Sequence, residues 1–284
     1  MKFHLGYNDL LPKGIPIMTR EIVVGDVHGC VDELGILIDR LQLKHDDHLV
    51  FVGDLINKGP DSAGVIDLVQ KIQRDVCKVT HLLGNHEEKF LRWVAHEEKR
   101  LVSAKENPIL DRAGKLAKLS RELNDEQIQF LRCARLWSPL TLARDSRTNP
   151  AIAVHAGITP GLKKLPDENT EKSSMNAKQW REVESLVRVR RISGSGDRVR
   201  LGDEQATDRF WAEVYDGRYG TIFFGHEAIL SNEVSRFPHA VGIDLGCVYG
   251  GHLAAVVFHQ GGQPFEQVLV KAQATYHSKR SNSG

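Results

Sequence analysis

Gly53-Asp-Leu-Ile-Asn-Lys-Gly-Pro-Asp-Ser62 is the stretch from which the fold is best predicted. It follows an apolar run at 48–52 that has the composition of a buried strand. After it, Asp61 or Ser62 can cap a helix that we predict over 63–74. Asp54 would then lie at the carboxyl end of a strand, where open α/β sheets bind ligands. For one isolated carboxylate, helix capping is the simpler explanation.

The same strand-loop-helix pattern occurs twice more. A strand is predicted at 21–24, before Gly25-Asp-Val-His-Gly29, and another at 77–83, before Gly84-Asn-His-Glu87. Each loop precedes an amphipathic helix, the last over about 88–100. Right-handed connections would bring the three strand ends to one edge of one sheet. The sequence therefore predicts an α/β fold with a polar cluster at that edge: Asp26, His28, Asp54, Asn85 and His86.

Two further polar residues follow predicted strands later in the chain. His155 comes directly after a strand at 151–154, and His226 comes shortly after a strand within 219–224. Between them, 159–216 has only a weak pattern and is rich in arginine. We interpret it either as a solvated loop or as a basic lip over an anionic substrate. The other predicted segments are a charged helical cap or insert at 101–137 and short strands at 239–244, 253–258 and 265–271.

Composition limits the possible functions. The 284 residues include 38 basic and 37 acidic side chains, and this balance predicts no general nucleic-acid surface. No apolar run reaches the roughly 20 residues of a membrane span. The N-terminus lacks the apolar core of a secretory signal, so we expect an intracellular, cytoplasmic protein. Four cysteines without C-x-x-C spacing predict reduced thiols, with neither a disulfide framework nor a zinc knuckle.

The strand-end residues together predict a metal site. A single histidine at a strand end is more often structural, by about two to one, but five separate loops of this kind make chance a poor explanation. Carboxylate, imidazole and amide ligands suit a pair of divalent ions, and the lack of thiolate argues against a structural zinc site. Asp54, on the middle strand, is the expected bridging ligand. Two such ions activate a water and stabilise an in-line phosphoryl displacement, while a neighbouring histidine can protonate the leaving oxygen.

The ordered motifs resemble those of the phosphoprotein-phosphatase-type metallophosphoesterases. They are Gly25-Asp-x-His-Gly29, Gly53-Asp-x-x-Asn-Lys-Gly59, Gly84-Asn-His-Glu87, His155-Ala-Gly157 and Gly225-His226. Within that group the chain is similar to the ApaH-like phosphatases, relatives of bacterial diadenosine tetraphosphatase. Asn57-Lys58 replaces the Asp-Arg pair of protein Ser/Thr phosphatases, and no Arg precedes Gly84. The segment from Ile243 to Gly251 is similar to a C-terminal ApaH signature.

The resemblance implies a role for each matching residue. Asp26 and His28 would hold one ion, Asp54 would bridge, and Asn85, His155 and His226 would hold the second. His86 would be the general acid, while Lys58 and Asn85 would bind phosphate. Arg190 is the expected second phosphate-binding cation, with Arg188 and Arg218 as rivals. Manganese is the expected metal, with iron, zinc, cobalt and magnesium as alternatives.

The resemblance also implies the fold and the reaction. It implies a four-layer α/β-β/α sandwich of two mixed sheets at 21–275, with inserts at 101–137 and 159–216. From the residues alone we expect an irregular arm at 1–20 and a disordered tail at 276–284. A metal-bridging hydroxide would hydrolyse a phosphoanhydride in a dinucleoside polyphosphate, an mRNA cap or inorganic polyphosphate. A protein Ser/Thr phosphatase is the alternative enzyme. A degenerate phosphoesterase acting as a scaffold is the non-enzymatic alternative, which the complete motif set disfavours.

Overall fold

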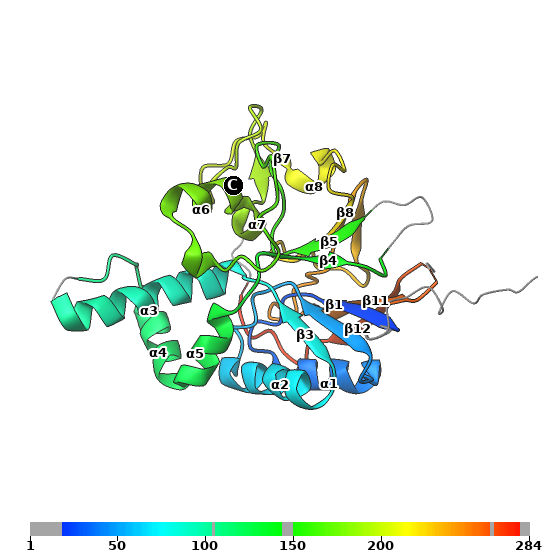
Figure 1. Cartoon of the computed structure of the whole chain (residues 1–284), viewed down its shortest axis with the longest axis horizontal. Helices are drawn as coiled ribbons and strands as arrows, with labels where there is room; N and C mark the ends of the chain where they lie inside the picture. Colours follow the sequence, from blue (N-terminus) through cyan, green and yellow to red (C-terminus); the bar gives the residue numbers. More distant parts are fainter. Residues whose placement is uncertain (1–18, 104–105, 144–149, 262–263, 279–284) are drawn as a thin grey trace, which may run out of the picture.

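The computed structural model describes residues 19–103, 106–143, 150–261 and 264–278 (Figure 1). The strands are β1 (Arg20–Val24), β2 (Asp47–Phe51), β3 (Lys78–His81), β4 (Trp137–Leu140), β5 (Ala151–Val154), β6 (Arg191–Ile192), β7 (Arg209–Phe210), β8 (Thr221–Phe224), β9 (Ser235–Phe237), β10 (Ala240–Gly242), β11 (His252–His259) and β12 (Glu266–Lys271). The α-helices are α1 (Val31–Leu41), α2 (Ser62–Asp75), α3 (Asn85–Ser103), α4 (Lys115–Glu122), α5 (Asp125–Arg132), α6 (Ala177–Val183), α7 (Ser185–Arg188) and α8 (Trp211–Val214). Two 3₁₀ turns, η2 (Arg112–Gly114) and η3 (Lys172–Ser174), complete the described elements.

Two mixed five-stranded sheets form the centre of the described structure. The first has the order β12-β11-β1-β2-β3, and the second has the order β4-β5-β8-β10-β9. In the first sheet β1, β2 and β3 are parallel neighbours, so their carboxyl ends share one edge, as the sequence predicted. In the second sheet β5 and β8 are parallel neighbours, so the residues that follow them share an edge too. The parallel order of these strands therefore places the polar loops of each sheet along one edge of that sheet.

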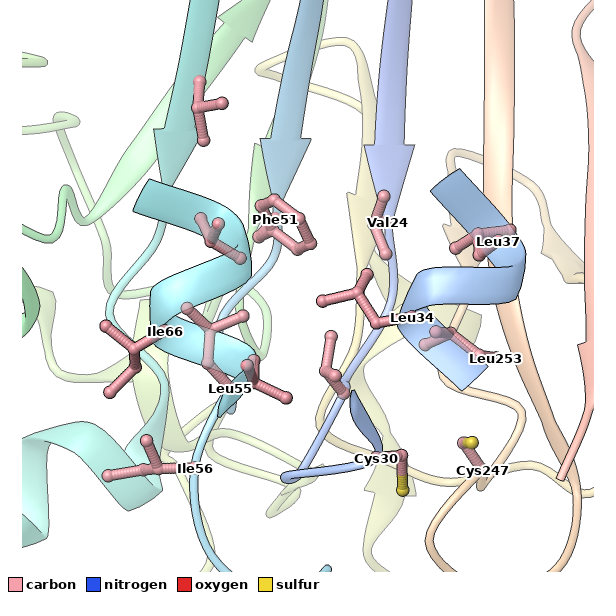
Figure 2. Packing of buried hydrophobic residues seen from close by; sticks show 14 of the residues in the cluster. Val24, Cys30, Leu34, Leu37, Phe51, Leu55, Ile56, Ile66, Cys247 and Leu253 are labelled. Carbon is pink, nitrogen blue, oxygen red and sulfur yellow. The ribbon is translucent and has the colours of Figure 1, made fainter. Parts of the chain in front are cut away.

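Successive side chains of β1 point to opposite faces of the first sheet, and their contacts show how the layers pack. Ile22 and Val24 join the apolar cluster beneath α1 and α2, whereas Val23 joins a second cluster with Phe223 and Val241 of the other sheet. Figure 2 shows Leu34 and Leu37 of α1 in the first cluster, which also contains Val24 and Phe51. A third cluster covers the far face of the second sheet with α7 and α8. Helix, sheet, sheet and helix thus form the predicted four layers (Figure 1).

Two predicted boundaries in the first half of the chain were wrong. Helix α3 begins at Asn85 and not near Glu88, so Asn85 and His86 lie on its first turn. The predicted helical segment 101–137 ends in β4, whose residues pair antiparallel with β5. Helix α5 of that segment packs beside α2, where Gln127 donates to the carboxylate of Asp67, and α4 packs beside α3. Pairing with β5 and burial of Leu140 outweigh the weak strand propensity of Trp-Ser-Pro-Leu in β4.

The segment 159–216 is not a solvated loop throughout. It contributes α6, α7, α8 and the β6-β7 pair, and it buries Trp211, Leu186 and Val187 in the cluster over the second sheet. These apolar residues lie in helices of four to seven residues, which are too short to give a clear helical period in the sequence. Its arginines remain on the surface side, and we describe them with the site.

The predictions for the chain ends and for the cysteines can also be compared with the structure. Residues 1–18 of the predicted arm and 279–284 of the predicted tail lie outside the described residues. The tail does not begin at 276, because the backbone N–H groups of Tyr276 and His277 both donate to the carbonyl of Val248. All four cysteines are free thiols, and Cys30 and Cys247 lie together in the core (Figure 2). No described helix is long and apolar enough to cross a membrane.

Candidate dinuclear metal centre

The loops that follow the strands carry most of the backbone strain in the described structure. Seven described non-glycine residues have positive φ, and five of them lie in these loops: His28, Asp54, Asn57, Lys58 and His226. Such a conformation costs about 1–3 kcal/mol for each residue and is concentrated at functional sites. The close approach of the loops adds a second constraint, because a Cβ on Gly225 would lie 1.9 Å from the Asp26 carboxylate. The strained loops after the strands therefore converge on one point in the structure.

Asp54 lies at that point. Its Oδ2 is 3.5 Å from His28 Nε2 on one side and 3.6 Å from His155 Nε2 on the other. His28 comes from the first sheet and His155 from the second, so the carboxylate connects the two halves of the fold. Asp26 lies beyond His28, with 3.9 Å between its Oδ2 and His28 Nε2. Asp54 therefore lies between the two histidines, which is the position that its predicted bridging role requires.

The remaining predicted ligands complete the second side of the cluster. Nε2 of His155 lies 3.2 Å from both Asn85 Oδ1 and His226 Nδ1. The backbone N–H of His226 donates to the Asp26 carboxylate, which links the two sides. The structure therefore brings together all six predicted metal ligands: Asp26, His28, Asp54, Asn85, His155 and His226.

Backbone carbonyls fix the tautomers of two of these histidines. Nδ1 of His28 donates to the carbonyl of Ile56 at 3.1 Å, and Nδ1 of His155 donates to that of Val52 at 2.9 Å. A carbonyl can only accept, so each ring must carry its proton on Nδ1 and direct the Nε2 lone pair into the cluster. Metal-binding histidines are commonly oriented in this way.

The cluster contains buried carboxylates whose negative charge a bound cation would balance. Burial, together with Asp244 and Asp54, raises the pKa of Asp26 well above its usual value. Burial also raises the pKa of Asp244 to about 6. Burial opposes ionisation of Asp54 too, but His155, His86, His28 and Lys58 hold its pKa well below the usual value. Three buried carboxylates this close together favour a positively charged ligand.

The histidines, in contrast, are held neutral. Burial lowers the pKa of His28, His155 and His226, so their lone pairs are available at neutral pH. Burial also lowers the pKa of His86 to about 4, against an opposing effect of Asp54. His86 packs edge-on against the His28 ring, with 4.8 Å between the ring centroids. Its backbone N–H donates to Asp54 Oδ1, which fixes its place on the first turn of α3.

Glu87 contacts the backbone beside the cluster, and the sequence analysis gave it no role. Its buried carboxylate accepts the backbone N–H of Asp54 at 2.9 Å, Ile56 at 3.1 Å and Gly84 at 3.1 Å. The glutamate thereby ties the first turn of α3 to the loop that presents Asp54. Its place in the motif Gly-Asn-His-Glu was the available signal, but the contact lies 33 residues away in sequence. Asp244, within the similar C-terminal signature, was also given no role.

Asn57 and Lys58 both lie beside the cluster, but their contacts differ. The Lys58 ammonium donates to His28 Nε2 at 2.7 Å and lies 5.2 Å from the centroid of the Tyr249 ring. Its charge therefore reaches the space that an anionic substrate would enter. The backbone of Asn57 donates to Ser62 Oγ at 3.0 Å. Among the described residues, no hydrogen bond joins Asn57 to His86.

A cavity of about 420 Å³ opens beside Asn85 and His226. Six arginines and three glutamates line it, together with Trp180, Val199 and Leu201: Arg92, Arg188, Arg190, Arg191, Arg198 and Arg200, and Glu88, Glu184 and Glu204. The six-to-three ratio leaves three excess positive charges in a chain whose formal net charge is only +1. The arginines of the predicted basic lip thus lie next to the cluster.

The structure separates the three candidates for a phosphate-binding arginine. Arg190 donates to Glu227 at 2.8 Å and to the carbonyl of His226 at 3.3 Å, so its guanidinium lies beside a predicted ligand. Arg188 also lines the cavity but pairs with Glu88. Arg218 does not line the cavity, and it donates to Asp216 and to the carbonyl of Pro160. Arg190 is the best placed of the three.

The residues present fit a divalent metal centre. His226 Nε2 is buried and has no hydrogen-bond partner among the described residues. Two groups, His28-Asp54-His86 and Asp54-His155-His226, have ligand atoms within 4.8 Å of one another. Their nitrogen and oxygen donors suit several divalent ions, and no thiolate belongs to either group. An uncompensated lone pair and excess buried carboxylates both favour a bound cation.

The fold and this cluster define a metallophosphoesterase, and comparison with known families agrees. Residues 20–256 match the calcineurin-like phosphoesterase family. The chain belongs to this family, so the predicted hydrolase class is confirmed.

More specific similarities are to bis(5′-nucleosyl)-tetraphosphatases. The asymmetrical enzyme PrpE of Halalkalibacterium halodurans is 28% identical over 83% of this chain and 89% of its own length. The symmetrical enzyme of Cellvibrio japonicus is also 28% identical, over 84% of this chain and 95% of its own length. A solved structure provisionally assigned as a diadenosine tetraphosphatase superposes with a TM-score of 0.62 at 27% identity, covering 91% of this chain and 96% of the other. The predicted relationship to ApaH-type enzymes is therefore confirmed.

Proposed function

We propose that this protein hydrolyses a phosphoanhydride bond of dinucleoside polyphosphates. The observation that supports this most directly is the arginine-lined cavity that continues from Asn85 and His226 of the cluster. A polyphosphate chain carries several negative charges in a row, and a wall with excess arginine provides matching charge along its length. Relatives named for both cleavage types, asymmetrical and symmetrical, are similar in sequence to most of this chain.

In the proposed reaction, two divalent ions held by the six ligands would supply an activated water and neutralise charge on the attacked phosphate. Asp54, between His28 and His155, would hold both ions at a fixed separation. Manganese is the ion that we expect, with iron, zinc, cobalt or magnesium as alternatives, because this ligand set accepts them all. The carbonyls of Ile56 and Val52 would keep the His28 and His155 rings in the orientation required.

Cationic side chains would position the substrate. Lys58, already within 2.7 Å of His28 Nε2, would move its ammonium to a phosphate oxygen. Arg190, beside the backbone of His226, would contact a second oxygen with its planar guanidinium. Asn85 would offer its amide nitrogen to phosphate while its oxygen faces the cluster. These groups would stabilise charge that develops in the transition state.

His86 would donate the proton to the leaving phosphate oxygen. Its low pKa of about 4 in the free protein leaves the ring neutral at pH 7. Because a bound phosphate chain places negative charge beside the ring, binding would raise this pKa and favour the protonated form. A histidine whose proton affinity rises only with substrate bound is a suitable general acid.

The test is a product analysis with four substrates. Purified protein would receive manganese, cobalt, zinc or magnesium and then diadenosine tetraphosphate, a capped RNA oligomer, long-chain polyphosphate or a phosphopeptide. We expect preferential cleavage of diadenosine tetraphosphate, lost in His86→Asn. Products of two ADP indicate symmetrical cleavage, whereas ATP and AMP indicate asymmetrical cleavage. Preferential turnover of the RNA cap, polyphosphate or phosphopeptide would contradict the proposed substrate.

A further inference from the structure

The arginine-lined cavity has a second, apolar part that phosphate binding does not require. Trp180, Val199 and Leu201 belong to its wall along with the charged residues. Trp180 comes from α6, whereas Leu201 comes from the connection between β6 and β7. Leu201 is 79% exposed, so its side chain is accessible to a ligand at the wall of the cavity. Two separate elements thus present apolar surface to the same cavity.

The Trp180 ring is only half-buried but is held in place. Lys172 lies over the indole, with 4.7 Å between its Nζ and the ring centroid. Asn176 and Gln179 form a reciprocal capping box that fixes the start of α6 directly before the tryptophan. Trp180 is also one of the partly buried residues that pack against the cluster of the second sheet. A large aromatic surface is therefore preorganised at the edge of a polar cavity.

The surrounding arginines differ in their freedom to bind a ligand. Arg188 pairs with Glu88, Arg190 with Glu227 and Arg198 with Glu184. Within the described residues, Arg191 and Arg200 have no ion-pair partner. Both are exposed at the cavity, so their charge is available for an incoming anion. The cavity therefore combines free cations with a fixed aromatic ring.

We propose that Trp180 is a stacking platform for one nucleobase of the substrate, with Leu201 covering the base edge. This inference rests on the proposed function and specifies the part of the substrate that the cavity distinguishes. A base can stack on an indole regardless of its identity, because every base has a π face. The base would displace the Lys172 ammonium from its position over the ring. The polyphosphate chain would then run past the arginines to Asn85 and His226. Inorganic polyphosphate has no group that could use Trp180.

The experiment measures inhibition and not only turnover of the proposed substrate. Hydrolysis of an aryl phosphate is inhibited with ADP or with pyrophosphate, and the ratio of the two inhibition constants reports recognition of the nucleoside. We expect ADP to bind more tightly than pyrophosphate to the wild-type protein. Trp180→Ala should reduce that preference about ten- to hundred-fold, as expected for loss of one base stack. The KM for diadenosine tetraphosphate should rise by a similar factor.

Two further variants separate stacking from packing. Trp180→Phe keeps a π face and should retain most of the preference, whereas Trp180→Leu keeps apolar bulk and should lose it. Thermal melting of each variant shows whether the fold is intact. An unchanged ADP-to-pyrophosphate ratio in Trp180→Ala, or full preference in Trp180→Leu, would overturn the proposal. If wild type does not cleave diadenosine tetraphosphate but still prefers ADP, the substrate assignment fails while the base platform is supported.

Discussion

At the scale of single residues, the position of one carboxylate organises the site. Asp54 Oδ2 lies almost equally far from His28 Nε2 and His155 Nε2, at 3.5 and 3.6 Å. Backbone carbonyls direct both lone pairs toward it, and His226 Nε2 has no hydrogen-bond partner in the described part of the chain. These side chains are buried, so water cannot solvate their charges, and an unpaired charge there costs free energy. Changes at this point should affect activity far more than fold.

We expect Asp54→Asn to reduce metal-dependent aryl-phosphate hydrolysis by at least about 100-fold. Changes to groups that only support a metal ligand already cost about 10–100-fold, and Asp54 is placed as the bridging ligand itself. Steady-state kinetics with a fixed manganese concentration measure the loss. Asp39→Asn makes the same change at an exposed carboxylate and should leave the rate unaffected. Wild-type activity in Asp54→Asn would refute its role as the bridge.

His81, whose ring stacks on Phe130 of α5, should make stability depend on pH. Its Nε2 donates to the carbonyl of Phe130, and burial lowers its pKa to about 4 from a usual 6.5. The unfolded chain therefore binds the proton first, so stability is full above pH 6.5 and falls as pH drops toward 4. The fall from this residue is at most about 3 kcal/mol.

Urea unfolding between pH 4 and 8 measures this effect. His81→Gln should show a smaller loss of stability across that window than wild type, since glutamine does not titrate. His239→Gln, at an exposed histidine, provides the control. Parallel pH profiles for wild type and His81→Gln would contradict the assignment.

At the scale of elements, the first turn of α3 connects the loops of the site. Asn85 and His86 occupy that turn, and Glu87 accepts N–H groups from both the Asp54 loop and Gly84. Burial and the nearby Asp54 raise the pKa of Glu87 to about 8. A buried carboxylate that satisfies three backbone donors cannot be lost without leaving some of them unpaired. The helix start is therefore part of the site.

Glu87→Ala should destabilise the protein by about 3 kcal/mol, because it leaves buried N–H donors unpaired. It should also weaken metal binding by about 10–100-fold by releasing the Asp54 loop. Chemical unfolding and metal titration measure the two effects. Glu98→Ala, on the exposed side of the same helix, loses only a surface ion pair with Arg132 and should cost at most about 1 kcal/mol. Equal costs for the two variants would exclude the proposed support role.

At the scale of the whole molecule, the site joins two sheets. Asp26, His28 and Asp54 follow strands of the first sheet, while His155 and His226 follow strands of the second. An apolar cluster with Val23, Val50 and Phe223 packs the sheets face to face. A cation bound by ligands from both sides would therefore stabilise the packing of one sheet on the other.

Removing metal with a chelator should lower the melting temperature, and adding manganese back should restore it. At a free ion concentration 100 times the dissociation constant, binding contributes about 2.7 kcal/mol. For a chain of this size that corresponds to roughly 5–10 °C. Differential scanning calorimetry measures the shift, and His226→Asn should reduce it. A melting temperature unaffected by manganese in wild type would argue against a metal centre.

The sequence by itself determined the strand-loop-helix units and named the polar residues that the structure brings together. Apolar runs at 21–24 and 48–52 followed by polar loops predict strands and their ends, because these are local patterns. Asp61 was likewise predicted as a helix cap, and it accepts the N–H of Gly64. The six metal ligands were named from such loops together with a family resemblance.

Only the tertiary structure decided how distant segments meet. The contacts of Glu87 with Asp54, of Arg190 with His226, and of Cys30 with Cys247 join residues far apart in sequence. The β4 strand and the short helices within 159–216 were also missed, since their burial depends on neighbours and not on their own periodicity. Local propensity specifies elements, whereas packing and buried charge are properties of the assembled fold.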